Sequence, residues 1–152
     1  MSEVTYTTVT DINAIDSVSE LKADYGDLHF SFSEEYLKRL KESLGDKNAL
    51  HIIAHDKDKS MGYIASSEKL FPGYSFIKEL IVDPIYQGRG IGKKLVGLVI
   101  ESAKDNNLKG VVVQTEFTNT PARELYEKLG FIPVENKEWK EGMTYRMDFL
   151  FS

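Results

Sequence analysis

The sequence contains no cysteine in its 152 residues. A disulfide framework, a thiolate nucleophile and a cysteine-ligated zinc site are therefore excluded. Long apolar runs are also missing, since none approaches the roughly 20 residues that a membrane-spanning helix needs. The opening residues, Met1 to Val4, lack the basic and then apolar pattern of a secretory signal. From these absences we expect a cytoplasmic protein that does not enter the membrane.

Basic residues are too few to balance the acidic ones, and the formal net charge is −5. This argues against nucleic-acid binding, because such proteins usually present a basic surface to the phosphates. The charge is uneven: residues 1–36 hold eight acidic residues and one basic residue, whereas residues 84–110 hold five basic and two acidic residues. A protein that binds an anion at one place and a cation at another would show this pattern. Two ordinary solvated faces would show it as well.

Proline is rare, with four residues against eleven glycines, while 41% of the residues are hydrophobic and 28% are charged. This composition is typical of globular proteins. A chain of 152 residues has about the length of one domain, and it contains no internal repeat and no linker that would divide it. We therefore expect residues 1–152 to form a single domain.

The spacing of apolar residues predicts an α/β fold. In the first half, strands are expected over residues 4–9, 49–55 and 61–66, and helices are expected to begin at Asp11 and at Ser33. Residues 23–32 show no sustained period and are expected to form a loop. Residues 56–60 have the composition of a hairpin connection, which would make the two strands around them antiparallel.

The second half predicts a parallel crossover, with strands over residues 75–82 and 111–115 on either side of a helix over residues 92–106. Thr120 is expected to cap a last helix, with Pro121 in its first position and Gly130 at its end. Strands over residues 131–134 and 143–151 would close the chain. We expect a single mixed central sheet of about six or seven strands, flanked by about four helices.

Residues 87–94, with the sequence Gln-Gly-Arg-Gly-Ile-Gly-Lys-Lys, lie between a predicted strand and a predicted helix. Glycine lets a ligand approach the backbone closely, and the first turn of a helix offers unpaired N–H groups with a partial positive charge. The loop is therefore a candidate anion site, although a turn that only reverses the chain has the same composition. Neither the P-loop signature nor the dinucleotide-binding fingerprint fits these residues.

Two motifs together resemble those of the GNAT superfamily of N-acetyltransferases. Gln87-x-x-Gly90-x-Gly92, after a strand that ends Leu80-Ile81-Val82-Asp83-Pro84, is similar to the acetyl-CoA signature of that family. Residues 119–131, Asn-Thr-Pro-Ala-Arg-Glu-Leu-Tyr-Glu-Lys-Leu-Gly-Phe, resemble its second hallmark. The resemblance implies a GNAT fold and the transfer of acetyl from acetyl-CoA to a primary amine, by direct attack in a ternary complex.

The resemblance also implies how acetyl-CoA is bound. The pyrophosphate would be held by main-chain N–H groups of the loop that begins at Gln87, namely those of Gly88, Arg89, Gly90, Ile91, Gly92 and Lys93. The pantetheine arm would pair with the main chain of Leu80, Ile81 and Val82, and the N–H of Val82 would stabilise the oxyanion. Asn119 matches an asparagine that contacts CoA in the family, although capping of the following helix is an alternative.

Tyr126 matches the tyrosine that is thought to protonate the departing thiolate in the family, although a buried core tyrosine is the alternative. The attacking amine must be neutral, so a base has to accept its proton. Glu79 is the first candidate, because burial in its apolar strand would raise the pKa of the carboxyl. A carboxylate paired with a neighbouring lysine is the alternative. Gln114 occupies a position where some relatives carry a glutamate, and Glu116 is a weaker candidate.

The acidic residues among the first 36 positions fall in the segment that the family uses for acceptor binding. They favour a cationic small molecule, such as a polyamine or an aminoglycoside, as the acceptor. A protein or peptide amine is one alternative, and a catalytically silent CoA-binding regulatory domain is another. His51 and His55 would lie roughly 13 Å apart in a strand, too far to share a metal, so we expect no metal. The resemblance also makes a homodimer conceivable, since dimers are frequent in the superfamily.

Overall fold

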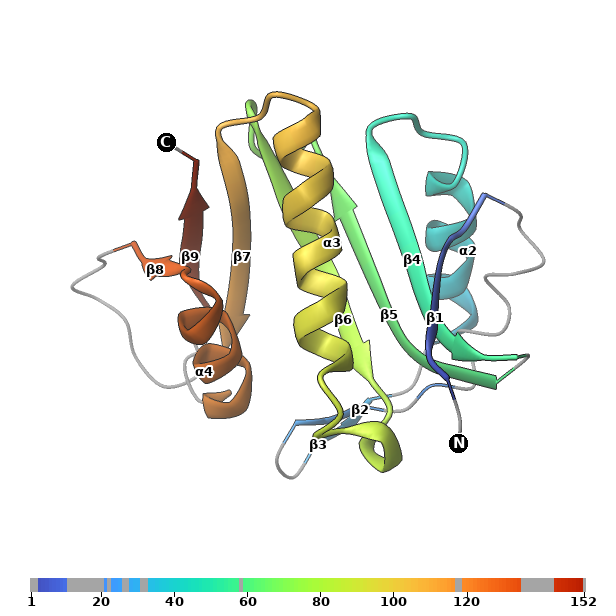
Figure 1. The fold of residues 1–152 in the computed structure, drawn as a ribbon. Coiled ribbons are helices and arrows are strands. Elements are labelled where there is room, and N and C mark those ends of the chain that lie inside the picture. The colour runs from blue at the N-terminus through green and yellow to red at the C-terminus, as the bar shows by residue number, and fades with distance from the viewer. Residues whose placement is uncertain are drawn as a thin grey trace.

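The computed structural model describes residues 3–10, 21, 23–25, 28–30, 33–57, 59–116, 119–134 and 144–151. Within these residues the chain forms strands, three α-helices and a short 3-10 helix (Figure 1). In chain order the elements are β1 (Thr5–Thr8), β2 (Ala23–Tyr25), β3 (Leu28–Phe30), α2 (Glu34–Ser43), β4 (Ala49–Asp56), β5 (Lys59–Ser67), β6 (Tyr74–Val82), η2 (Pro84–Tyr86), α3 (Ile91–Asp105), β7 (Gly110–Glu116), α4 (Thr120–Leu129), β8 (Ile132–Pro133) and β9 (Thr144–Leu150).

Seven of the strands form one mixed sheet in the order β1-β4-β5-β6-β7-β9-β8. Strands β6 and β7 are parallel, and α3 lies between them in the sequence. The other neighbouring pairs of the sheet are antiparallel. The predicted mixed sheet, the hairpin of β4 and β5, and the parallel crossover are therefore confirmed. Parallel neighbours require such a crossover, because a tight turn can only join antiparallel strands.

Helices cover both faces of this sheet, with α3 and α4 on one face and α2 on the other (Figure 1). The apolar stripe of α3, which includes Leu95, Val96 and Val99, is completely buried against the sheet. On the opposite face, Leu40 of α2 packs in a second, smaller core that contains Tyr63. The sheet thus separates two apolar layers, and strands β4, β5 and β6 contribute side chains to both.

Two helix ends follow the sequence prediction. The hydroxyl of Ser33 accepts a hydrogen bond from the N–H of Tyr36 at 3.1 Å and caps α2. Gly130 ends α4 in the left-handed region, at a φ of 106° that favours glycine. In the part of the chain that the structure describes, no helix is long and apolar enough to cross a membrane.

Two predictions are wrong and one is not addressed. Residues 23–32 were expected to form a loop, but β2 and β3 pair as an antiparallel ribbon, and strands of three residues are too short to show a period. Asn119 rather than Thr120 caps α4, because its side-chain oxygen accepts the N–H of Ala122 at 3.3 Å. The helix expected from Asp11 lies outside the described residues.

Candidate active site

The glycine-rich loop leads directly into α3. Gly88 and Gly90 have φ values of 82° and 79°, which side chains with a Cβ rarely adopt. The first hydrogen bond of α3 runs from the N–H of Lys94 to the carbonyl of Gly90 at 3.0 Å. The N–H groups of residues 91–93 precede that bond and have no acceptor within the helix. The loop therefore presents a set of main-chain donors at the positive end of the helix dipole.

Side chains before and between the glycines hold the loop in place. The carboxylate of Asp83 accepts the N–H of Ile85 at 3.2 Å, and the side-chain amide of Gln87 donates to the carbonyl of Val82 at 3.2 Å. The guanidinium of Arg89 lies over the ring of Tyr86, 5.4 Å from its centroid. Gln87 therefore has a structural contact with the end of β6, which the sequence did not predict.

Next to this loop, the sheet is only partly joined. The parallel pairing of β6 with β7 runs from Tyr74–Gly110 to Ile77–Val113 and then stops, although both strands continue. At the same place β6 has a bulge, since Ala65 pairs with Glu79 and Ser66 pairs with Ile77. Lys78, between these partners, is the extra residue. The last four residues of β6, 79–82, are thus paired with β5 alone among the described residues.

The alternation of an antiparallel ladder shows which main-chain groups face the unpaired side. The N–H of Asp83 donates to the carbonyl of Met61 at 3.0 Å, which makes these two residues a hydrogen-bonded pair. Two residues earlier, Ile81 lies opposite Tyr63 and faces β5 in the same way. The peptide groups of Leu80 and Val82 therefore point toward β7, whereas that of Ile81 does not.

Glu79 lies half-buried on the face of the sheet that carries α2. The hydroxyl of Tyr36, from α2, donates a hydrogen bond to its Oε2. Burial raises the pKa of the Glu79 carboxyl above its ordinary value, and the hydrogen bond from Tyr36 opposes part of that rise. Tyr36 falls on the apolar side of α2 together with Leu37 and Leu40, so the sequence pattern alone indicates a core position and does not reveal this contact. The signal that could have revealed the contact is a tyrosine among the apolar residues of a helix in a chain that also has a carboxylate in an apolar strand, because both polar groups need a partner when buried.

Tyr126 lies on the opposite face of the sheet, in the core that contains the apolar stripe of α3. Its side chain is 4% exposed, and its ring makes an edge contact with Phe131 at 5.3 Å between centroids. The two predicted catalytic residues are thus placed on different faces. Among the other candidates, Gln114 is exposed on β7, and Glu116 is the last residue of that strand.

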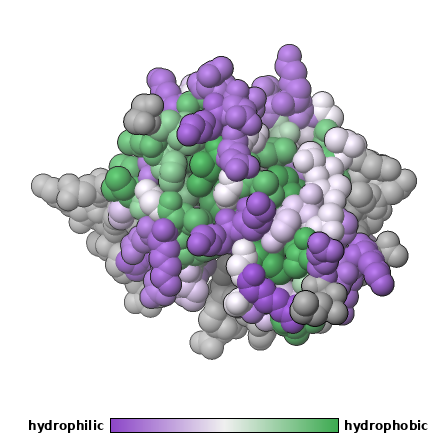
Figure 2. Space-filling view, viewed as in Figure 1, coloured by the Kyte–Doolittle hydropathy of each residue, from purple (hydrophilic) through white to green (hydrophobic). Residues whose placement is uncertain are grey.

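An open hollow of about 300 Å³ lies beside α3 on the same face as Tyr126. Its lining consists of Gly90, Lys93, Lys94, Gly97, Leu98, Glu101 and Leu129. The space-filling view of this face shows hydrophobic areas next to hydrophilic side chains (Figure 2). The hollow therefore lies between α3 and the end of α4, and its lining includes Lys93 and Lys94. The described residues contain no group of three or more histidine, aspartate or glutamate side chains that could hold a metal.

A model of the acetyltransferase (GNAT) family matches residues 15–131, which is more than half of the chain. The chain belongs to this family. N-alpha-acetyltransferase 30 of Saccharomyces cerevisiae is 39% identical over 60 residues, which are 40% of this chain and 34% of that protein. Mycothiol acetyltransferase of Nocardia farcinica is 42% identical over 53 residues, which are 35% of this chain and 18% of that protein. The matches thus span about a third or less of these GNAT relatives.

Solved GNAT structures share the fold over nearly the whole chain. The PaiA N-acetyltransferase from Thermoplasma acidophilum, in complex with coenzyme A, superposes with a TM-score of 0.75 at 17% identity. That match covers 98% of this chain and 99% of the other. The ribosomal-protein-S18-alanine N-acetyltransferase from Escherichia coli gives a TM-score of 0.75 at 18% identity, over 99% of this chain and 95% of the other. The predicted GNAT fold is confirmed.

Proposed function

We propose that this chain transfers an acetyl group from acetyl-CoA to a primary amine. The observation that carries the proposal is the position of the unpaired side of β6 next to the glycine-rich loop. The unpaired main-chain edge of β6 is followed along the chain by the N–H groups at the start of α3. The pantetheine arm of acetyl-CoA would pair with the strand edge, and its pyrophosphate would bind the N–H groups. Membership of the GNAT family supports the same assignment.

Acetyl-CoA would be held largely by main-chain groups. The N–H groups of residues 88–93 would bind the pyrophosphate, and Arg89 and Lys93, both exposed, would add positive charge. The peptide groups of Leu80 and Val82 would pair with the pantetheine amides, since both point toward the unpaired side. Asn119 caps α4, and a CoA contact by the same side chain remains our prediction. When bound, acetyl-CoA supplies the activated thioester carbonyl that the amine attacks.

Glu79 would accept the proton of the substrate ammonium. A carboxyl whose pKa is raised by burial is a stronger base than an exposed one, so the proton transfer from the amine becomes less unfavourable. Tyr126 would return a proton to the departing thiolate from the other face of the sheet. Where β6 and β7 are not paired, an amine and a thioester bound between the strands could contact Glu79 on one face of the sheet and Tyr126 on the other.

A cationic small molecule is the acceptor that the charge distribution favours, because eight of the first 36 residues are acidic. A peptide or protein α-amine is the second candidate, since one relative bears the name N-alpha-acetyltransferase. Glu79 does not distinguish the two, because both acceptors carry the ammonium group that it would contact.

The proposal is tested by thiol release from acetyl-CoA when the purified chain is offered a panel of amines. The panel contains spermidine, kanamycin and short peptides with free N-termini. Because the chain has no cysteine, a thiol-reactive dye reports only the CoA that is released. We expect release that depends on the acceptor, and a loss of about 100-fold in the Glu79→Gln variant. The Glu42→Gln variant, which changes an exposed glutamate of α2, is the matched control.

Binding of CoA without release of thiol for any amine would contradict the enzymatic proposal and support a regulatory domain. Full activity of Glu79→Gln would contradict the role of Glu79 while leaving the acetyl transfer itself intact.

A further inference from the structure

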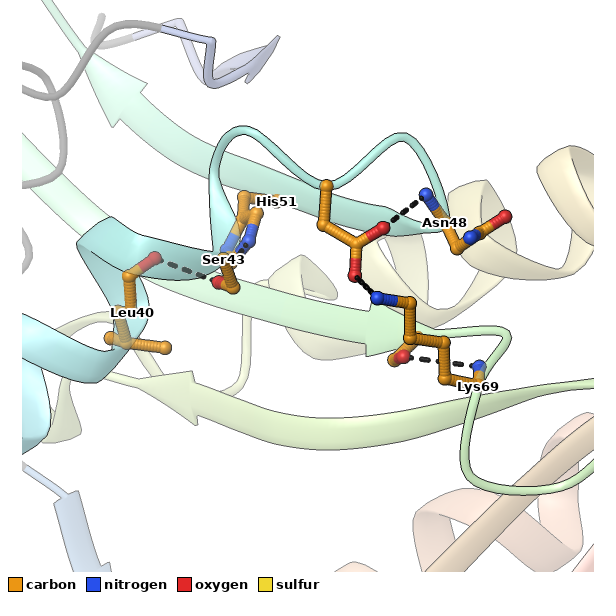
Figure 3. Close-up of polar contacts among 7 residues, drawn as sticks. Leu40, Ser43, Asn48, His51 and Lys69 are labelled. Carbon is orange, nitrogen blue, oxygen red and sulfur yellow. Dashed lines mark hydrogen bonds and ion pairs between the residues drawn. The ribbon is translucent and has the colours of Figure 1, made fainter.

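Behind Glu79 lies a chain of hydrogen bonds that the proposed reaction does not use. The hydroxyl of Tyr63 contacts Nδ1 of His51 at 2.6 Å, and Nε2 of His51 contacts the hydroxyl of Ser43 at 2.9 Å. The hydroxyl of Ser43 in turn donates to the carbonyl of Leu40 at 2.7 Å (Figure 3). We name this the polar chain. Tyr63 is completely buried and His51 is 4% exposed, so water does not compete freely for these contacts.

The register of the sheet places the polar chain beside the carboxylate. His51 of β4 pairs with Ala65 of β5, which in turn pairs with Glu79 of β6. Tyr63 is two residues from Ala65 and therefore lies diagonally to both His51 and Glu79, within reach of a long side chain. Burial raises the pKa of Tyr63, and the charges of Tyr36 and Glu79 add to the rise, which agrees with this proximity.

Counting hydrogens fixes the direction of the polar chain. A carbonyl can only accept a hydrogen bond, so the hydroxyl of Ser43 donates its single hydrogen to the carbonyl of Leu40. The oxygen of Ser43 must therefore accept a hydrogen bond from His51. Nε2 of His51 therefore carries a hydrogen. Burial, and secondarily the charge of Lys78, lower the pKa of His51, so the imidazole is neutral near pH 7 and its Nδ1 carries none. Nδ1 must then accept the single hydrogen of Tyr63.

The consequence concerns the oxygen of Tyr63. Because its hydrogen is given to His51, that oxygen can offer only lone pairs toward the side of Glu79. A lone pair stabilises a protonated carboxyl, which can donate to it, and disfavours the carboxylate, which cannot. Within the part of the chain that the structure describes, the titratable groups on the side of Glu79 are Tyr36 from α2 and Tyr63 from β5, with His51 from β4 behind Tyr63. Lys78 is the neighbour of Glu79 on β6.

We propose that Tyr63 and His51 are positioning residues for Glu79: His51 orients the hydroxyl of Tyr63 so that its oxygen favours the carboxyl form created when Glu79 takes the ammonium proton. The proton moves only from the amine nitrogen to the carboxylate, and the hydrogen of Tyr63 stays on His51. The inference rests on the proposed function of Glu79 as the base.

Its test measures Glu79 directly, by following the carboxyl carbon signal through a pH titration by NMR, with the Glu79→Gln spectrum for assignment. Tyr63→Phe removes the lone pair, and His51→Leu frees the hydroxyl of Tyr63 to turn and donate to the carboxylate. We expect both changes to lower the proton affinity of Glu79 by roughly 5- to 10-fold, as for one hydrogen bond. His51→Leu should add nothing further once Tyr63→Phe is present.

The conservative variant separates this role from a structural one. His51→Asn places an amide oxygen near the position of Nδ1, so it should keep the proton affinity of Glu79 although it cannot titrate. The control is His55→Leu, four residues along the same strand, where the imidazole contacts Thr7 and the carbonyl of Lys57 instead. Melting curves of all variants verify that they are folded.

Two further readouts complete the test. The nitrogen shifts of His51 in the unmodified chain should show a neutral ring with its hydrogen on Nε2, and a hydrogen on Nδ1 would overturn the inference. With an acceptor present, His51→Leu should lower kcat but not KM for acetyl-CoA, and His51→Asn should restore kcat. An unchanged Glu79 titration in folded His51→Leu would overturn the inference even if acetyl transfer is intact. A failure of Glu79→Gln to lose activity would instead refute only its role as the base.

Discussion

At the scale of single residues, the environment of Glu79 is assembled from elements far apart in sequence. A bulge at Lys78 interrupts the alternation of β6, so that Ile77 packs with the core under α3 while Glu79 meets Tyr36 of α2. Without the bulge, Ile77 and Glu79 would share a face because side chains alternate along a strand. One extra residue therefore decides which helix the carboxylate faces.

Tyr126 provides a test on the other face. Tyr126→Phe removes the hydroxyl that would protonate the thiolate but keeps the ring that packs against Phe131. We expect turnover to fall about 100-fold, the scale of general acid catalysis, while the affinity for CoA stays nearly constant. Steady-state rates and calorimetric titration with CoA measure the two quantities. Equal turnover in the variant would show that Tyr126 is a core residue only.

His51 should make the stability of the protein depend on pH. Its pKa is lowered in the folded state, so the unfolded chain binds more protons as the pH falls below about 6.5. The contribution of His51 to the free energy of unfolding should therefore be largest above that pH and decrease as the pH falls toward its folded-state pKa. Urea denaturation at pH 7.5 and at pH 5.5 measures the difference. His51→Leu should diminish this difference, whereas His55→Leu should not. An equal change in the free energy of unfolding between the two pH values in both variants would contradict the assignment.

Sequence reasoning predicted the burial of Glu79 and its consequence for the pKa, because the neighbouring apolar residues are visible in the strand itself. It could not predict the partner of that carboxylate. Tyr36 is 43 positions away, and only the packing of α2 on the sheet brings the two together. The bulge at Lys78 was equally hidden, since its signal is a register shift between two strands rather than a pattern in one.

At the scale of elements, the glycine-rich loop depends on backbone conformation. Gly90 is the N-cap of α3 at a φ of 79°, and an added Cβ would meet nothing within 4 Å. The cost of Gly90→Ala is therefore conformational, on the order of 1–2 kcal/mol, and not steric. Chemical denaturation measures it, with Gly45→Ala as the control, because Gly45 has equally open surroundings without a positive φ. A similar loss in both variants would disprove the conformational explanation.

Two further glycines should respond in opposite ways to the same substitution. Gly97 lies inside α3 in open space, so Gly97→Ala should stabilise the protein by about 0.5–1 kcal/mol through helix propensity. At Gly110, the first residue of β7, a Cβ would lie 2.1 Å from the carbonyl oxygen of Phe149. Gly110→Ala should therefore destabilise the protein by at least about 2 kcal/mol. Thermal unfolding of both variants compares them, and a loss at Gly97 would contradict the first half.

The long elements were predictable because each carries its own signal. The apolar spacing of α3 and the β-branched run of β7 are local, and both appear close to their predicted positions. The ribbon of β2 and β3 was missed because its strands have three residues each and pair with one another outside the main sheet. The cap at Asn119 was misplaced by one position, since Asn119 and Thr120 are both good capping residues.

At the scale of the whole molecule, the two central strands part at the end nearest the glycine-rich loop. Amide exchange can test whether this unpaired edge receives CoA. The N–H groups of Leu80 and Val82 should exchange more slowly when CoA is added, because pantetheine would accept from them. The N–H of Ile81 faces β5 already and should not change. Hydrogen–deuterium exchange followed by NMR resolves the three positions, and protection of Ile81 alone would contradict the alternation.

The positions of Glu79 and Tyr126 on different faces have a consequence for inhibitor design. In the proposed reaction, a single compound that mimics both reactants would have to pass from one face of the sheet to the other beside Val82. Neighbouring paired strands lie only about 4.8 Å apart, so even a widened opening there leaves little room for side branches. The connecting part of such a compound should therefore be narrow and unbranched, with amides spaced to bond the main chain, while its two ends can be bulky.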